Sequence, residues 1–127
     1  MTDLAPNWWP LARLGEAIEA LALDAGLIRD PATDPLVVPA AFALDDVPRW
    51  TEWAAARLGV EAVDVETPAV AIAAVLASGG PAILLDDTAE GPGFFALAGR
   101  RRGGVMLLDQ HAHRRRVPLE TLRDRLV

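Results

Sequence analysis

The sequence predicts a single α+β domain in which N-terminal helices pack on a small, mostly antiparallel sheet. In the first half of the chain, apolar residues recur at three- and four-residue spacing, which is typical of amphipathic helices. The second half holds short apolar segments separated by glycine-containing turns, as strands do. Helices followed by strands, without regular alternation, indicate the α+β class. The 127 residues, 52% of them hydrophobic, suit one domain with one core.

The first helix is expected to begin at Pro10 and to end at Gly26. Proline suits the first position of a helix, and glycine readily takes the left-handed conformation that ends one. Between them, the apolar face is formed by Leu11, Leu14, Ile18, Leu21 and Ala25. Residues 28–47 are rich in Pro and Asp, and this composition predicts an irregular connection.

A second helix is expected to pass through Trp50 and Trp53 and to end at Gly59, with Asp45 or Asp46 as its N-cap. Trp50 and Trp53 lie three residues apart, so we expect both to pack on one face of this helix.

The next segment is expected to contain a strand and a buried helix. Residues 60–66 alternate with period two, as a half-exposed strand does. Thr67-Pro68 then opens a third helix that is apolar nearly all round, and Gly79-Gly80 ends it.

The second half of the chain predicts four strands and a last helix. A buried strand is expected at residues 81–85, followed by a hairpin of residues 93–99 and 105–109 with its loop at 100–104. A short fourth strand is expected at residues 114–117. The last helix begins at Pro118.

The composition excludes several classes of protein. The chain has no cysteine, which excludes disulfide frameworks, zinc ribbons and any cysteine nucleophile in this chain. Its longest aliphatic run, residues 70–77, is far shorter than the about 20 residues that span a bilayer. The N-terminus lacks the basic start and apolar stretch of a signal peptide. We therefore expect a soluble domain on the cytoplasmic side.

The net charge of −6 is unevenly distributed. Residues 1–99 hold 4 Arg and 15 acidic residues, which gives −11, and residues 100–127 hold 8 Arg and 3 acidic residues, which gives +5. The arginines gather in two triplets, at 100–102 and 114–116. Such clusters can bind anionic lipid head groups, so proximity to a membrane stays open. No aromatic residues interleave with them, and we expect no nucleic-acid partner.

Several segments together resemble a known family of domains. They include a helix that ends in Leu58-Gly59-Val60, a strand that opens with Gly80-Pro81-Ala82, and the three segments Gly93–Leu97, Val105–Gln110 and Val117–Leu122. In their order and spacing, these segments resemble the papain-like, bacteriocin-processing peptidase domain at the N-terminus of peptidase-containing ABC exporters. The resemblance covers most of residues 1–127 and implies a papain-like fold.

The resemblance also locates the positions that carry the family's chemistry. Counting back from the end of the first helix puts the nucleophilic cysteine at Arg13, and the amide of the oxyanion hole falls six residues earlier, at Asn7. The general-base histidine falls on Gly93, and only the acid that orients it remains, as Asp109. Amide cleavage of this kind needs a thiolate and an imidazole. The resemblance therefore implies a degenerate member without catalytic residues.

On this interpretation the chain is a non-catalytic, peptidase-like accessory domain of an ABC exporter. Its partner is a peptide or protein substrate, such as a leader peptide, or the transporter's membrane domain in cis or in trans. The domain is expected at the inner face of the bacterial membrane, as a possible N-terminal fragment of a larger transporter. It needs no cofactor of its own, since ATP belongs to a fused or partner ABC domain.

Two other functions stay open from the sequence. One is a stand-alone protein-interaction module without a link to export. The other is a hydrolase that uses Asp109 together with His111. A hydrogen bond between this carboxylate and an imidazole, inside a pocket, would favour the hydrolase.

The expected binding surface lies beside the first helix. In the resembling family, an amphipathic leader helix docks by its apolar face, which requires shape and apolar surface but no catalyst. Trp8 and Trp9 are adjacent on an extended segment, so both cannot point inward and one should be exposed or half-exposed. With Asn7, Arg13 and Phe94 they are the predicted binding residues.

A metal site is not expected. Asp109, His111 and His113 alternate, as metal ligands on a strand can. However, residues 110–113 are expected to form a turn between two short strands, where histidines are usually solvated.

Overall fold

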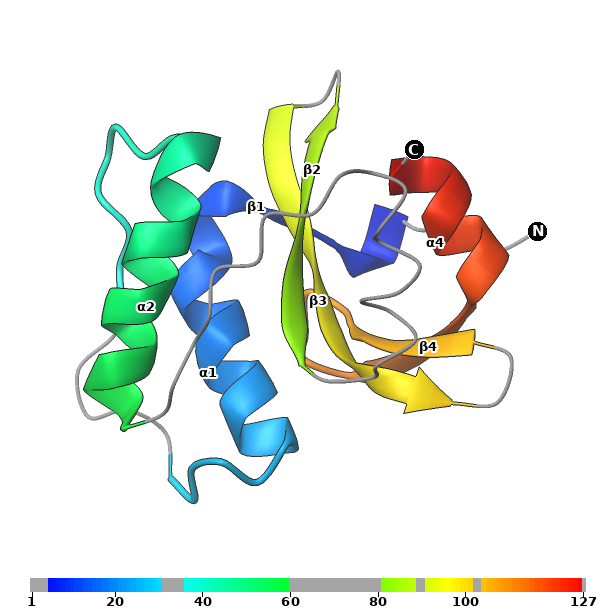
Figure 1. Cartoon of the computed structure of the whole chain (residues 1–127), viewed down its shortest axis with the longest axis horizontal. Coiled ribbons are helices and arrows are strands. Elements are labelled where there is room, and N and C mark those ends of the chain that lie inside the picture. The colour runs from blue at the N-terminus through cyan, green and yellow to red at the C-terminus, as the bar shows by residue number, and fades with distance from the viewer. Residues whose placement is uncertain (1–4, 31–35, 60–80, 89–90, 102–103, 127) are drawn as a thin grey trace.

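The computed structural model describes residues 5–30, 36–59, 81–88, 91–101 and 104–126 as a curled antiparallel sheet combined with helices. Helices α1 and α2 lie together on one side of the sheet, and α4 lies at the opposite end of the domain (Figure 1). The helices are α1 (Leu14–Asp24), α2 (Val47–Leu58) and α4 (Leu119–Leu126), with 3-10 turns η1 (Ala5–Asn7), η2 (Leu11–Arg13) and η3 (Leu44–Asp46). The strands are β1 (Trp8–Pro10), β2 (Ala82–Thr88), β3 (Gly91–Arg101), β4 (Gly104–Leu108) and β5 (Arg114–Pro118).

The mixed helix-and-sheet class and the first two helices are confirmed. The helix expected after Pro10 begins as the short turn η2 and continues as α1, and Gly26 ends it with a φ of 73°. Gly59 ends α2 in the same way, with a φ of 78°. The expected cap of α2 differs in detail. Asp46 is the N-cap residue, but its carboxylate accepts a hydrogen bond from the N–H of Ala43 and so stabilises the preceding turn.

The long strand β3 is the centre of the sheet. One of its edges pairs with β2 from Gly91 to Leu97. The opposite edge is shared by two strands that follow each other in line, with β1 beside Gly93–Phe95 and β4 beside Ala96–Arg101. β5 then pairs with β4.

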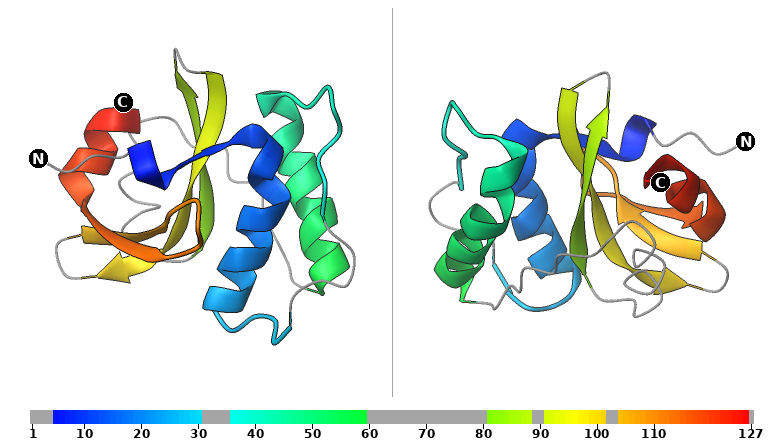
Figure 2. Two further views of the ribbon diagram at one scale, coloured as in Figure 1. Left: turned by 180° about the vertical axis from the view of Figure 1, so that it is seen from behind. Right: turned by 45° about the horizontal axis from the view of Figure 1, so that its top comes forward.

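The strand β1 was not expected as a separate element. It has only three residues, which are too few to show a period-two pattern, and one of them is a proline. It pairs with β3 so that Trp8 lies opposite Phe95 and Trp9 lies opposite Phe94. Seen from behind, β1 and its flanking turns run from the end of the domain that carries α4 to the start of α1 (Figure 2).

The sheet separates two apolar clusters, one on each face. Trp9 and Phe94 belong to the cluster beneath α1 and α2, where their rings stack with centroids 5.9 Å apart. Trp8 and Phe95 belong to the cluster on the other face, which α4 covers with Leu122. This division follows from the alternation of side chains along a strand.

The remaining strands are close to expectation. The hairpin, the fourth strand and the last helix are confirmed as β3–β4, β5 and α4. The strand expected at residues 81–85 runs from 82 to 88, and Leu85 is 41% exposed, so this strand is not buried throughout. The strand expected at 60–66 and the helix at 67–79 lie outside the described residues. In the part of the chain that is described, no helix is long and apolar enough to cross a membrane.

The position of Trp9 leads to a stability prediction. Trp9 is 1% exposed, and its Nε1–H donates to the carbonyl oxygen of Leu108 at 2.9 Å. We expect Trp9→Phe to lower the free energy of unfolding by about 2 kcal/mol, because it removes this buried hydrogen bond and part of the packing. The matched control is Trp53→Phe, since Trp53 is 49% exposed and its replacement should change little. Urea denaturation followed by circular dichroism measures both, and equal effects would contradict the assignment of Trp9 to the core.

Candidate functional site

The site is built where β1 and β4 meet along the edge of β3. We call Trp8, Trp9, Arg13, Glu16 and Gln110 the junction cluster. Gln110 is the second residue after the end of β4, and its Nε2 donates to the carbonyl oxygen of Trp8 at 2.6 Å. Its backbone N–H donates to the carbonyl oxygen of Pro6 at 3.4 Å. These bonds join the N-terminal segment to the β4–β5 turn.

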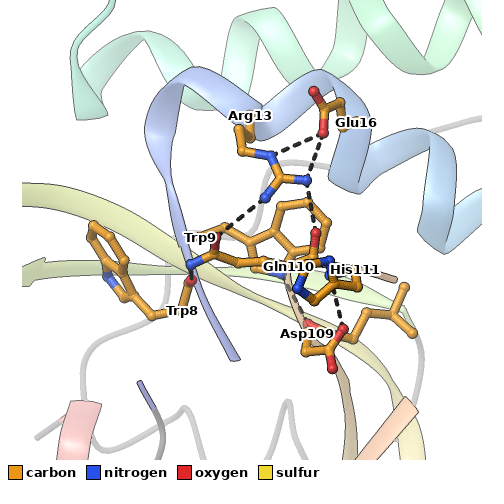
Figure 3. A network of polar contacts seen from close by, with 8 residues as sticks. Trp8, Trp9, Arg13, Glu16, Asp109, Gln110 and His111 are labelled. Carbon is orange, nitrogen blue, oxygen red and sulfur yellow. Dashed lines mark hydrogen bonds and ion pairs between the residues drawn. The ribbon is translucent and has the colours of Figure 1, made fainter. Parts of the chain in front are cut away.

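Arg13 holds the helical side of the junction cluster (Figure 3). Its Nη2 donates to the carbonyl oxygen of Gln110 at 2.7 Å and to the carboxylate of Glu16 at 2.8 Å, and its Nε donates to the same carboxylate at 2.9 Å. The guanidinium also lies over the ring of Trp9, 4.7 Å from the centroid. Only a third of the side chain is exposed. The guanidinium is therefore fixed from several directions.

Gly93 provides the space that Trp8 fills. A Cβ atom added at Gly93 would overlap the indole ring of Trp8 and lie 2.5 Å from its Nε1. The absence of a side chain at position 93 is therefore what lets the indole lie against β3. Trp8 Nε1 is buried there without a hydrogen-bond partner in the described structure.

Asp109 organises the turn that follows β4. Its side chain is 3% exposed, and Oδ1 accepts hydrogen bonds from the backbone N–H groups of His111 and His113 at 2.9 and 3.0 Å. Its Oδ2 accepts from the Nε of Arg115 at 2.9 Å. Burial of the carboxylate raises its pKa, but the bonds from His113, Arg115 and His111 outweigh burial and lower the pKa from 3.8 to about 2.

Of the three positions that the resemblance assigns to catalysis, Arg13 belongs to the junction cluster, and Gly93 and Asp109 adjoin it. Arg13 bonds to Gln110, which is the residue after Asp109, and Gly93 lies under Trp8. None of the three residues is a cysteine or a histidine, the types that the resembling peptidases use as nucleophile and base.

Three of the expected binding residues lie in the interior, which corrects the expected surface. Trp9 is 1% exposed, Phe94 is fully buried and Asn7 is 4% exposed. Adjacent residues on a strand do point to opposite faces, as expected, but both faces of this sheet are covered. Trp8 is only half-buried, and with Arg13 it is what remains of the predicted binding surface.

The alternative site of Asp109 with His111 depends on contact between the carboxylate and an imidazole. The hydrogen bond that joins these two residues runs instead from the backbone N–H of His111. His111 and His113 themselves are exposed. The carboxylate therefore stabilises the turn by accepting hydrogen bonds from its backbone.

The second arginine triplet is engaged within the domain. Arg114 forms a two-pronged ion pair with Asp24 at the end of α1, at 2.7 and 3.1 Å, and this pairing raises the pKa of Arg114. Arg115 pairs with Asp109. These contacts tie β5 to α1 and to the turn, and contact of the triplets with lipid stays a prediction.

Sequence reasoning missed two residues of the junction cluster. Glu16 had a readable signal, because an acid three residues after Arg13 on a helix is placed to pair with it. Gln110 had none, since a glutamine in a turn can point anywhere until the tertiary structure is known.

Comparison with known proteins gives no relative. No family model matches the chain, and neither a curated protein nor a solved structure matches it significantly.

The contact of Gly93 with Trp8 predicts a pairwise energetic coupling. We expect Gly93→Ala to lower the free energy of unfolding by about 1–3 kcal/mol, because the new methyl group and the indole compete for one space. In a Trp8→Ala background the same change should cost at least about 1 kcal/mol less. Urea denaturation of the double-mutant cycle measures the coupling, and Trp53→Ala is the control background. Equal costs in all three backgrounds would refute the contact.

The pKa of Asp109 predicts how stability depends on pH. The pKa in the folded state is lower than in the unfolded state, so the stabilisation is complete above about pH 4 and is lost as the pH falls toward 2. The maximum contribution is about 2 kcal/mol. In Asp109→Asn this loss of stability at low pH should be absent. Asp124→Asn, at an exposed position of α4, should keep the parent's dependence of stability on pH. Urea denaturation across this pH range measures it, and parallel profiles for Asp109→Asn and the parent would contradict the assignment.

Proposed function

We propose that the chain is a non-catalytic, peptidase-like accessory domain of an ABC exporter, which binds a peptide or protein partner without cleaving it. Within this proposal, the junction cluster corresponds to the peptidase cleft of the papain-like fold. The partner is a peptide substrate or the transporter's membrane domain, and the domain works at the cytoplasmic side of the membrane.

The observation that carries the proposal is the meeting of three positions that are far apart in the sequence. The resemblance assigns Arg13, Gly93 and Asp109 to one cleft. In the structure, the Gln110 carbonyl that follows Asp109 accepts from Arg13 at 2.7 Å, and Gln110 also bonds to Trp8, which covers Gly93. Proximity of the three positions is what a shared cleft requires, and it supports the proposal.

The chemistry of the cluster supports binding in preference to catalysis. Arg13 is a cation that Glu16 and Gln110 hold in place, and it has no lone pair with which to attack a carbonyl. Trp8 fills the space above Gly93, where a base would have to stand. The guanidinium of Arg13, a third of whose side chain is exposed, can donate hydrogen bonds to the backbone of a peptide. The half-buried Trp8, on the other face of the sheet, can offer apolar contact.

The test is photo-crosslinking from the rim of the junction cluster in the source cells. A photoreactive amino acid replaces Ala12, an exposed residue next to Arg13, and the matched control carries it at Arg49 on the exposed face of α2. We expect position 12, but not position 49, to be crosslinked to an exporter membrane domain or to a peptide that the exporter secretes, as identified by mass spectrometry.

The identified partner then allows a quantitative test. Arg13→Ala should weaken its binding at least about ten-fold by calorimetry, because removal of a fixed guanidinium leaves its acceptor unpaired, and Arg49→Ala should not. The partner should stay intact during incubation with the domain. Cleavage of the partner, or the same crosslinked proteins from both positions, would overturn the proposal.

A further inference from the structure

The turn between β4 and β5 is held in one conformation by a set of short hydrogen bonds. The N–H of Asp109 donates to the carbonyl oxygen of His113 at 2.9 Å, and the N–H of Ala112 donates to the carbonyl oxygen of Asp109 at 2.8 Å. The carboxylate of Asp109 closes the turn from inside by accepting from the N–H groups of both histidines. The backbone that carries the two imidazoles is therefore fixed.

Ala112, between the two histidines, has an unusual backbone conformation. Its φ is 62°, and among the described residues it is the one non-glycine residue with a positive φ. A residue other than glycine needs support from its surroundings to stay there, at a cost of about 1 kcal/mol. Here the turn that imposes this conformation carries two exposed imidazoles whose ring centroids lie 6.2 Å apart, with planes tilted by 42°.

We propose that His111 and His113 form a two-imidazole site for a divalent transition-metal ion. An imidazole nitrogen binds such ions at about 2.0 Å, which puts the ring centroid about 3.1 Å from the ion. Two rings on one ion therefore have centroids about 5 Å apart at a tetrahedral angle and about 6 Å apart on opposite sides. The separation of 6.2 Å lies at the upper end of this range. Rotation about the exposed side-chain bonds brings the two nitrogens to one ion.

The ligand set indicates the class of ion. Neutral imidazoles suit Zn²⁺, Ni²⁺ and Cu²⁺ and not Mg²⁺ or Ca²⁺, which prefer oxygen ligands. Asp109 is not available as a ligand, because both its oxygens are engaged. In the described part of the chain no group of three or more His, Cys, Asp or Glu is suitably placed. Water completes the coordination, and the ion keeps open positions.

The charges around the turn permit a cation to bind. Arg114 and Arg115 follow the histidines directly and would repel an ion if they were unpaired. Arg114 is paired with Asp24, and Arg115 is paired with Asp109. Each guanidinium thus has a carboxylate beside it, which compensates the positive charge near the imidazoles.

Zn²⁺ titration followed by NMR tests the site, because the chain contains only two histidines and their imidazole signals are easily distinguished. We expect the signals of both rings to shift together with one midpoint, at one ion per chain. His111→Asn should raise the Zn²⁺ concentration at the midpoint of the His113 titration at least about ten-fold, and His113→Asn should do the same for the His111 titration. In each variant a single imidazole binds the ion, without a second ligand held close to it.

The controls separate chelation from damage to the fold. Both substitutions are at exposed positions, so the backbone amide spectrum should stay that of the parent. Ala112→Gly keeps both histidines and accepts a positive φ without strain, so it should still bind Zn²⁺ through both rings. Two separate midpoints in the parent, or unchanged affinity in either single histidine variant, would overturn the proposal.

Discussion

The fold depends on the pairing of three residues, Trp8–Pro10, with the central strand β3. Through this pairing, two adjacent tryptophans enter opposite faces of the sheet. Trp9 enters the cluster beneath α1 and α2, and Trp8 enters the cluster that α4 covers. The same three residues lead directly into η2 and α1, so their register on β3 also sets the position of the first helix. Large rings bury much apolar area per residue, which explains how so short a strand can join two layers.

The order of strands on β3 determines which residues can meet. Because β1 and β4 share one edge, the end of β4 lies next to the start of β1, and the turn after β4 comes within reach of Arg13. The junction cluster is thus a consequence of the topology, although Gln110 is about a hundred residues away from its other members in the chain. Trp8 reaches across β3 to Gly93, where only a residue without a side chain fits. Under the proposed function, the general-base histidine of the resembling family is replaced by Gly93. The same glycine leaves the space that the indole of Trp8 fills.

Much of the fold was predictable because its signals are local. Gly26 and Gly59 end helices by their own conformational freedom, and the glycine-containing hairpin and the apolar strands can be read without tertiary information. The strand β1 was not predictable, since pairing with β3 defines it and its three residues carry no periodicity. The burial of Phe94 and Trp9 was missed for a related reason. Alternation predicts that neighbours face opposite ways, but only the structure tells that both faces of this sheet are covered.

Asp109 shows why a residue assigned from a resemblance does not carry a function by itself. A carboxylate orients an imidazole only if the ring is within reach, and here the acceptors of Asp109 are taken by two backbone N–H groups and by Arg115. The low pKa of about 2 follows from these bonds, which favour the charged form against the effect of burial. Its role is therefore to hold the turn that carries His111 and His113 in one conformation.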